Sequence, residues 1–148
     1  MVSAIAPASR DIPPNNNRRT KSMDKATYEK GLKIRRETLG EDYVNKALAN
    51  VDDFGRDLQE LVTTYCWGEV WGREGLDRKT RSTINLAMIS ALNRPHELAA
   101  HIRGAINNGV TPDEIKEILL QVGIYCGVPA MVDSFRIART VLGEMNEI

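Results

Sequence analysis

The sequence predicts an all-α fold, a helical bundle in which copies of the chain associate. Two observations support the helical class. Helix start and stop signals divide nearly the whole chain after Ser22 into segments of helical length. No segment alternates apolar and polar residues with a two-residue period for long enough to form a sheet, and no internal repeat is present. At a length of 148 residues, a single domain is expected.

Residues 1–22 differ in composition from the rest of the chain. Pro13 and Pro14, followed by the run Asn15–Asn17, disfavour regular structure, and the segment carries a net positive charge. It lacks the apolar core of a secretory signal. We therefore predict a disordered N-terminal extension, followed by a helical domain over residues 23–148.

The first part of the domain is expected to hold three helices. Asp24 is placed to cap a helix that runs to about Leu39, and Gly40 can end that helix in a left-handed turn. A short helix over residues 41–50 follows. A longer one is expected from about Asp53 to Trp71, and the segment GREGLD then interrupts the helices.

Two further helices have clear start signals. Asp77 is placed to cap a helix that runs to about Leu92. Pro95 begins the next helix, which carries both histidines of the chain and ends at Gly109.

The segment TPDE gives the clearest local signal in the sequence. Thr111 is expected to be the N-cap, Pro112 the first helical residue, and Glu114 the acidic partner of a capping box. The last two helices are expected over residues 113–126 and 130–145, with the segment GVP between them.

The helix over residues 113–126 is apolar around most of its circumference. A helix of this kind needs neighbours on all sides, which a small bundle rarely supplies alone. We therefore expect burial between subunits and a homo-oligomer. The residues concerned are Ile115, Ile118, Leu119, Leu120, Val122, Ile124 and Tyr125.

Composition excludes several classes of protein. The formal net charge is zero, which argues against a nucleic-acid-binding protein with a broad basic surface. No apolar run reaches the roughly 20 residues of a membrane span. Cys66 and Cys126 form no disulfide framework, so a cytoplasmic location with two buried or half-buried thiols is expected. The sequence contains no HExxH zinc motif, no phosphate-binding glycine loop and no GxSxG motif of the kind found in hydrolases. No metal site is predicted.

The histidines are candidates for proton transfer. His101 lies at the edge of the apolar face of its helix, one turn from Glu97. At such a boundary a carboxylate can hold one ring nitrogen while the other faces a cleft. The alternative is a half-exposed histidine paired with Glu97. His96, at the start of the helix, is a weaker candidate.

A second cluster of chemically capable side chains lies in WGEVWGREGLDRKTRS, residues 67–82. Arginines can bind carboxylates through two parallel N–H groups, and indoles can form an apolar wall, so this segment could form the mouth of a pocket. The alternative is a helix end with core tryptophans and a solvated run of charge. Tyr125 is either a core residue or a hydroxyl donor at a site. The cluster holds Trp67, Glu69, Trp71, Arg73, Arg78 and Arg81.

Three segments carry a family resemblance: VWGREGLDRKTRS, ELAAHIRGAINNGVTPDEI and YCGVPA. In this order and at these separations they resemble the carboxymuconolactone decarboxylase family, and the similarity extends over residues 24–142. The resemblance implies the all-helical, alkylhydroperoxidase D-like fold. It also implies a trimer-based homo-oligomer, commonly a hexamer.

The resemblance also separates two branches of that fold. Members of the alkylhydroperoxidase D group use two cysteines, a histidine and a glutamate for thiol chemistry. With His101 aligned to their histidine, the cysteine positions fall at Arg94 and Glu97, and the glutamate position falls at Ser82. The two cysteines of this chain match neither position, so the thiol couple is missing. The decarboxylase branch is favoured.

For activity, the resemblance implies loss of carbon dioxide from 4-carboxymuconolactone to give 3-oxoadipate enol-lactone, a step of protocatechuate catabolism in the β-ketoadipate pathway. The partner is thus a small carboxylated lactone, and no cofactor is expected. Electrons from the departing carboxylate can move through the ring alkene to the lactone carbonyl. The enzyme must then hold a dianion, stabilise an oxyanion and protonate carbon.

The roles follow as hypotheses from the resemblance and the residue chemistry. His101 is assigned as the general acid, oriented by Glu97 or Glu69. Substrate binding is assigned to Arg81, with support from Arg73, Arg78, Trp71, Tyr125 and His96. Three alternatives stay open. These are a decarboxylase or isomerase of another carboxylated lactone or keto acid, a thiol peroxidase, and a non-catalytic oligomer that binds a small acid.

Overall fold

The computed structural model describes residues 24–148, and the extension predicted for residues 1–22 lies outside this part of the chain. Within residues 24–148 every regular element is a helix, which confirms the predicted all-α class. In chain order these are α1 (Lys25–Leu39), α2 (Glu41–Ala49), α3 (Arg56–Leu61), η1 (Val62–Val70), α4 (Arg78–Ala91), α5 (Pro95–Asn107), α6 (Pro112–Cys126) and α7 (Val128–Glu144).

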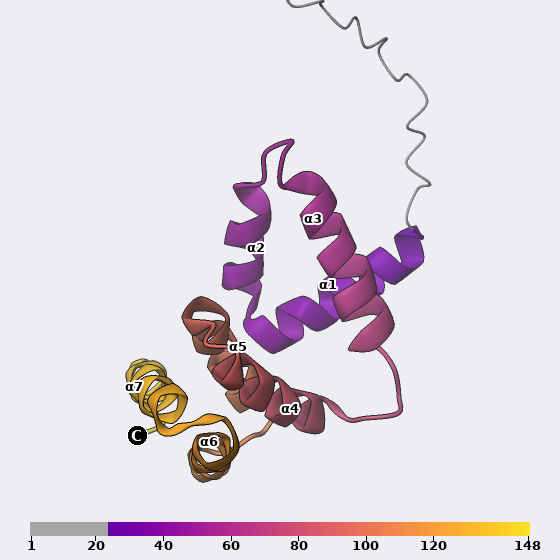
Figure 1. The fold of residues 1–148 in the computed structure, drawn as a ribbon. Coiled ribbons are helices and arrows are strands. Elements are labelled where there is room, and N and C mark those ends of the chain that lie inside the picture. Colours follow the sequence, from indigo (N-terminus) through magenta and orange to yellow (C-terminus); the bar gives the residue numbers. More distant parts are fainter. Residues whose placement is uncertain (1–23) are drawn as a thin grey trace, which may run out of the picture.

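The N-terminal elements are built on a close contact between α1 and η1, from which α2 and α3 extend to one side (Figure 1). A Cβ added to Gly31 would come within 2.0 Å of the Thr63 carbonyl oxygen, and one added to Gly68 within 2.5 Å of the Thr27 carbonyl oxygen. Only glycine allows backbones to approach this closely. A small core that includes Ile34 lies beside this contact.

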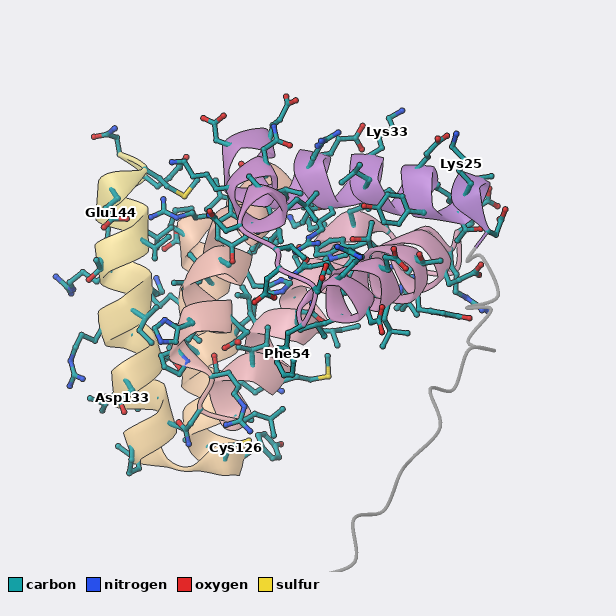
Figure 2. The ribbon with its side chains drawn as sticks, turned by 90° about the horizontal axis from the view of Figure 1, so that it is seen from above. Lys25, Lys33, Phe54, Cys126, Asp133 and Glu144 are labelled. Atoms are coloured by element: carbon teal, nitrogen blue, oxygen red, sulfur yellow. The ribbon has the colours of Figure 1, made fainter. Side chains whose placement is uncertain are left out.

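Helices α4 to α7 form a second packed group on the other side of α1 (Figure 1). α5 joins the two groups, because the Asn107 side-chain amide donates to the Thr38 carbonyl oxygen at 2.8 Å. Figure 2 shows Cys126 and Asp133 at one end of the α6–α7 pair and Glu144 at the other. The centre of the main core contains Leu86, Leu98, Ile102, Ile115 and Leu119.

The predicted helix signals are confirmed at three N-termini. The Asp24 carboxylate accepts from two backbone N–H groups of α1, and the Asp77 carboxylate accepts from the Thr80 N–H of α4. The capping box of α6 is present in both directions, since Thr111 and Glu114 each accept from the other's backbone N–H. Gly40 ends α1 with a φ of +94°, a conformation that favours glycine.

The helix predicted over residues 53–71 differs from the structure in two ways. It begins at Arg56, because the Asp52 carboxylate accepts from the Gly55 N–H and holds a turn before it. It also changes at Val62 into a π-helix, in which each N–H bonds to the carbonyl five residues earlier; the bond from Trp71 to Cys66 is 2.9 Å. π-Helical segments are rare in proteins, and those that occur are often found at functional sites.

One side of α6 packs into the bundle, where Ile115, Leu119 and Val122 are buried. The other side is open in the single chain, and Ile124 is 82% exposed. The helix thus carries more apolar surface than its own chain covers. Among residues 24–148, no helix is long and apolar enough to cross a membrane.

Candidate active site

The π-helix η1 places two tryptophans against the interior. Trp67 and Trp71 are buried, and their ring centroids lie 4.8 Å apart. Glu69, between them in sequence, is exposed to solvent. Both indoles belong to the small core that includes Ile34, as the alternative of core tryptophans expects. We call this buried pair, Trp67 and Trp71, the tryptophan wall. The repeated tryptophan four residues apart was the signal for this pairing.

The imidazole of His101 lies against this wall. Its centroid is 6.2 Å from that of the Trp67 ring, with only 5° between the planes, and 6.3 Å from that of Trp71. Burial lowers the pKa of His101, and the charge of Glu97 raises it by a smaller amount. Because the desolvated imidazolium is disfavoured, the ring is mostly neutral near pH 7.

Neither predicted carboxylate holds the imidazole by a hydrogen bond. Glu97 is exposed, and within residues 24–148 no hydrogen bond or ion pair joins His101 to Glu97 or Glu69. The surface ion pair considered for His101 and Glu97 is thus not formed. Stacking on the indoles, rather than a carboxylate, limits the orientation of the ring in this chain.

Arg81 lies in the first turn of α4 and is half-buried. Its Nη2 donates to the Arg73 carbonyl oxygen at 3.2 Å, while its Nε is buried and has no partner within residues 24–148. Arg73 follows Trp71 by two residues, so this hydrogen bond ties Arg81 to the loop that leaves the tryptophan wall. A half-buried guanidinium without a carboxylate in the described chain is suited to bind an anion.

The other two arginines of the cluster differ from Arg81. Arg78 already binds a carboxylate, since its Nη1 lies 2.7 Å from an oxygen of Glu37, and both side chains are partly exposed. Arg73 is exposed. Both line a hollow of about 630 Å³ together with Trp71, so the structure brings these three predicted binding residues to one place.

His96 and Tyr125 lie at other hollows. His96 is exposed and lines a hollow of about 460 Å³ beside Arg103. Tyr125 is 81% exposed, which makes the core interpretation wrong for the single chain. It lines a hollow of about 340 Å³ between α4 and α6. Neither residue contributes to the hollow that Trp71 lines.

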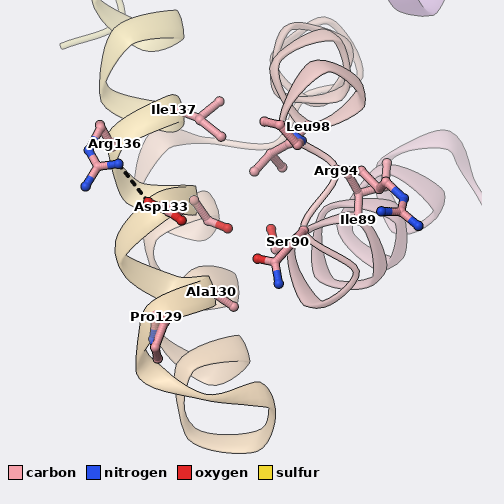
Figure 3. A pocket seen from close by; sticks show the side chains of 12 residues that line it. Ile89, Ser90, Arg94, Leu98, Pro129, Ala130, Asp133, Arg136 and Ile137 are labelled. Carbon is pink, nitrogen blue, oxygen red and sulfur yellow. Dashed lines mark hydrogen bonds and ion pairs between the residues drawn. The ribbon is translucent and has the colours of Figure 1, made fainter.

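A pocket of about 480 Å³ that the sequence did not suggest lies between the end of α4, the start of α5 and α7 (Figure 3). Arg94 and the buried Ser90 line it, and Asp133 and Arg136 form an ion pair at its edge. Its lining includes neither His101 nor Arg81.

The expectation of two buried or half-buried thiols is wrong for Cys126, which is exposed. Cys66 is also exposed as a residue, although the protein around its sulfur partly desolvates the thiol, and both cysteines are free. Cys66 lies on the solvent side of η1, and Cys126 ends α6 at the turn into α7. Ser82, at the position that corresponds to the peroxidase glutamate, is buried and accepts a hydrogen bond from the Asn108 amide at 3.0 Å. No thiol pair is formed among the described residues.

The fold and the site define an all-helical protein with a half-buried imidazole beside two buried indoles and a half-buried arginine that pairs with no carboxylate of the described residues. The sequence pattern of the carboxymuconolactone decarboxylase family matches residues 56–140. The chain belongs to the carboxymuconolactone decarboxylase family.

Three relatives show how this family varies. A 4-carboxymuconolactone decarboxylase of Acinetobacter baylyi is 43% identical over 123 residues, which cover 83% of this chain and 92% of that protein. A nitrosuccinic acid decarboxylase of Metarhizium robertsii is 42% identical over 83% of this chain and 86% of that protein. An uncharacterised 15.0 kDa protein of Paracoccus denitrificans is 35% identical over 70% of this chain and 82% of that protein.

Proposed function

We propose that this chain is a decarboxylase that converts 4-carboxymuconolactone to 3-oxoadipate enol-lactone in protocatechuate catabolism, without a cofactor. The observation that carries the proposal is the half-buried imidazole of His101 on its tryptophan wall, in a chain 43% identical to an enzyme of that name along 92% of its length. A neutral imidazole in a water-poor place is suited to accept a proton on substrate binding and to deliver it to carbon.

Arg81 is the proposed anchor for the carboxylate that the product retains. Its half-buried guanidinium pairs with no carboxylate of the described residues, and the bond to the Arg73 carbonyl fixes it on one side. A planar guanidinium held in this way can donate two parallel N–H groups to a carboxylate. Arg73 lines the same hollow as Trp71 and adds positive charge at its mouth. Arg78 contributes only if substrate displaces Glu37.

The chemical step needs no electron acceptor besides the substrate. The bond between the ring carbon and the departing carboxylate breaks, and its electron pair moves through the ring alkene to the lactone carbonyl. Carbon dioxide leaves, and a furanolate-like dienolate remains. His101 then gives a proton to the carbon next to the carbonyl, which yields the enol-lactone. The imidazole recovers its proton from solvent.

The protonation state of His101 depends on the substrate. Burial lowers the pKa of the imidazole in the free chain. A bound dianion acts in the opposite direction, because nearby negative charge favours the imidazolium, as the charge of Glu97 already does. Substrate binding would therefore be accompanied by proton uptake at His101, and the acid would form only where it is used.

The departing carboxylate is placed against Trp71. This indole is buried and forms part of the tryptophan wall. The charge of a carboxylate is less well stabilised beside an indole than in water, whereas neutral carbon dioxide loses little favourable solvation there. The indole therefore favours the loss of carbon dioxide. Tyr125 is the weaker candidate for a donor to the lactone oxygen, and another copy of the chain would have to bring it to the site.

A homo-oligomer is part of the proposal. The open side of α6 holds Leu120 and Ile124 in addition to Tyr125, and all three are exposed in the single chain. Large apolar residues in such a row are normally covered by a partner. A trimer or hexamer would cover them, and light scattering of the purified protein measures which of the two is formed.

The second candidate substrate is nitrosuccinate, because the relative of that name is 42% identical. It is also a small dianion whose leaving carboxylate sits on a carbon next to an electron acceptor, here a nitro group. Loss of carbon dioxide gives a nitronate, and protonation on carbon gives 3-nitropropanoate. Arg81 and His101 would serve both reactions in the same roles.

The experiment is to supply purified protein with each acid in turn and to identify the product by mass spectrometry, with carbon dioxide measured directly. Turnover of 4-carboxymuconolactone at a kcat/KM at least tenfold above that for nitrosuccinate supports the proposal. The reverse preference favours the second candidate. If both acids raise the melting temperature without turnover, the chain is a small-acid-binding oligomer instead.

The thiol peroxidase alternative has a separate test. Because Cys66 and Cys126 lie apart on different helices, they are not arranged as a redox pair in the described chain. We expect the Cys66→Ser, Cys126→Ser double variant to decarboxylate at the wild-type rate. Peroxidase activity that disappears in this variant would support the alternative.

A further inference from the structure

A buried arginine, Arg35 on α1, has no carboxylate partner. The residue is only 7% exposed. Its Nη1 donates to the Gln59 side-chain carbonyl at 2.9 Å and to the Thr63 hydroxyl at 3.2 Å, which are both neutral acceptors. Its Nε is buried without a partner, and no ion pair joins Arg35 to any of residues 24–148. The positive charge is therefore compensated by neutral groups alone.

Such an arrangement is unusual, because buried charges are normally paired. Burial lowers the pKa of Arg35, and only Tyr43, Tyr28 and Cys66 act on it through their charges. These three groups are neutral when protonated, so no Asp or Glu is among the neighbours that shift the pKa of Arg35. The electrostatic environment of the guanidinium is therefore that of an anion site.

The free edge of the guanidinium has a definite shape. Nη1 is used by two protein oxygens, and the edge formed by Nε and Nη2 makes no hydrogen bond with residues 24–148. Two parallel N–H groups on one edge of a guanidinium match the two oxygens of a carboxylate. The chemistry of this edge selects a carboxylate over a spherical anion such as chloride.

Two residues close enough to Arg35 to act on its charge reach the surface of the molecule. Tyr43 on α2 is 49% exposed, and Cys66 on η1 is exposed. Exposed apolar side chains also occur on α3 and η1, the segments that supply Gln59 and Thr63 to Arg35, and in the turn before α3, and they could contact the hydrocarbon body of a bound acid. The exposed apolar residues are Phe54, Leu58, Leu61 and Tyr65.

We propose that Arg35 anchors a second binding site, between α1, α2 and η1, for a small organic carboxylate. The site is distinct from that of His101: the side chain of Arg35 bonds to Gln59 and Thr63, whereas His101 stacks on Trp67 and Trp71. The free Nε and Nη2 donate to the two carboxylate oxygens, and the hydrocarbon part of the acid lies toward Tyr43.

Cys66 provides a local reporter of occupancy. Partial burial raises the pKa of its thiol, and the positive charge of Arg35 lowers it. A carboxylate on Arg35 would cancel part of that charge and reduce the thiolate fraction. In a Cys126→Ser chain, we expect adipate to slow alkylation of Cys66 by iodoacetamide about threefold or more at pH 8, relative to sodium chloride at equal ionic strength.

Two variants at Arg35 and one at the other site make the test specific. Arg35→Met removes the buried charge and retains a long apolar stem, so the variant should fold. Its Cys66 should be alkylated slowly without adipate, and adipate should not change that rate. Arg35→Lys retains the charge without the planar fork and should need at least tenfold more adipate for the same effect. His101→Ala should respond like the parent chain.

Three outcomes would overturn the proposal. The first is an equal response to adipate and chloride in the parent chain. The second is a response to adipate that persists in Arg35→Met, or in Arg35→Lys at the same concentration if the Met variant fails to fold. The third is that alkylation of Cys66 slows as the protein concentration rises, independently of adipate, while light scattering shows an increase in native mass. This last result would assign the carboxylate to a second copy of the chain.

Discussion

The rings of His101 and Trp67 are nearly parallel, with 5° between their planes and 6.2 Å between their centroids. The two residues come from α5 and η1, which belong to different packed groups of helices. The imidazole is thus desolvated by a tertiary contact rather than by its own helix. Its lowered pKa, and the chemistry proposed for it, depend on how these two groups are joined.

This desolvation predicts a pH dependence of folding stability. The ordinary pKa of 6.5 applies to His101 in the unfolded chain, and burial lowers the pKa in the folded chain. Above pH 6.5 the contribution to stability is fully present; as the pH falls toward the folded-state pKa it is lost, because the unfolded chain binds the proton more readily. We expect the urea midpoint to fall between pH 7 and pH 5, and the fall to be smaller in His101→Phe. An equal slope in both proteins would contradict a desolvated imidazole.

The role of His101 as acid predicts a loss of turnover without a loss of assembly. His101→Ala should lower kcat by about 10²–10⁴, the usual contribution of a positioned acid, while the native mass stays unchanged. In the wild type, kcat/KM should rise as the pH falls from 8 toward the lowered pKa of His101. Steady-state kinetics over this range measures both effects.

His96→Ala is the matched control for this variant, because His96 is exposed on the same helix and lies at a different hollow. Its turnover should stay within about twofold of wild type, as is usual away from the reacting groups. If the two alanine variants have equal activity, His101 has no part in the mechanism.

Arg81 should act on substrate capture more than on chemistry. Arg81→Lys retains the charge but loses the planar fork, and a charged hydrogen bond contributes about 1.5–3 kcal/mol. We expect KM to rise about tenfold or more, with a small change in kcat. Arg103→Lys, which alters a surface ion pair with Glu144, is the control and should keep its KM. An unfolded Arg81→Lys would reassign Arg81 to a structural role, and an unchanged KM would remove it from the site.

The features that sequence alone predicted correctly are local. Asp77 and Thr80 are three residues apart, as are Thr111 and Glu114, so each cap depends on a single turn of chain. Such contacts form wherever the helix forms, whatever packs against it. The same holds for the φ of +94° at Gly40, which depends on the residue itself.

The features that were missed depend on distant segments. The change to a π-helix at Val62 accompanies the backbone contact with Gly31, some thirty positions earlier. The exposure of Tyr125 could not be predicted because an apolar residue at a helical position is compatible with the core and with an interface. Arg35 was missed for a related reason: charge argues for the surface, and only the tertiary contact with Thr63 shows its burial.

The contact between α1 and η1 gives the last prediction. A Cβ on residue 31 would lie 2.0 Å from the Thr63 carbonyl oxygen and 2.7 Å from the Gly68 nitrogen, which are both backbone atoms and cannot rotate away. Alanine favours a helix by about 1 kcal/mol over glycine, but overpacking of this kind costs about 1–3 kcal/mol or more. Gly31→Ala should therefore lower the melting temperature and, because η1 moves, change the fluorescence of Trp67 and Trp71.

Gly143→Ala on α7 is the matched control for this change. It is also helical, but an added Cβ there meets no atom within 4 Å. The helix preference of alanine is then unopposed, and the free energy of unfolding should stay the same or rise by up to about 1 kcal/mol. Thermal melting of both variants tests the geometry, because only Gly31→Ala should lower the melting temperature. If Gly31→Ala melts at or above the wild-type temperature, α1 and η1 are not in backbone contact, and the tryptophan wall that desolvates His101 must be positioned in another way.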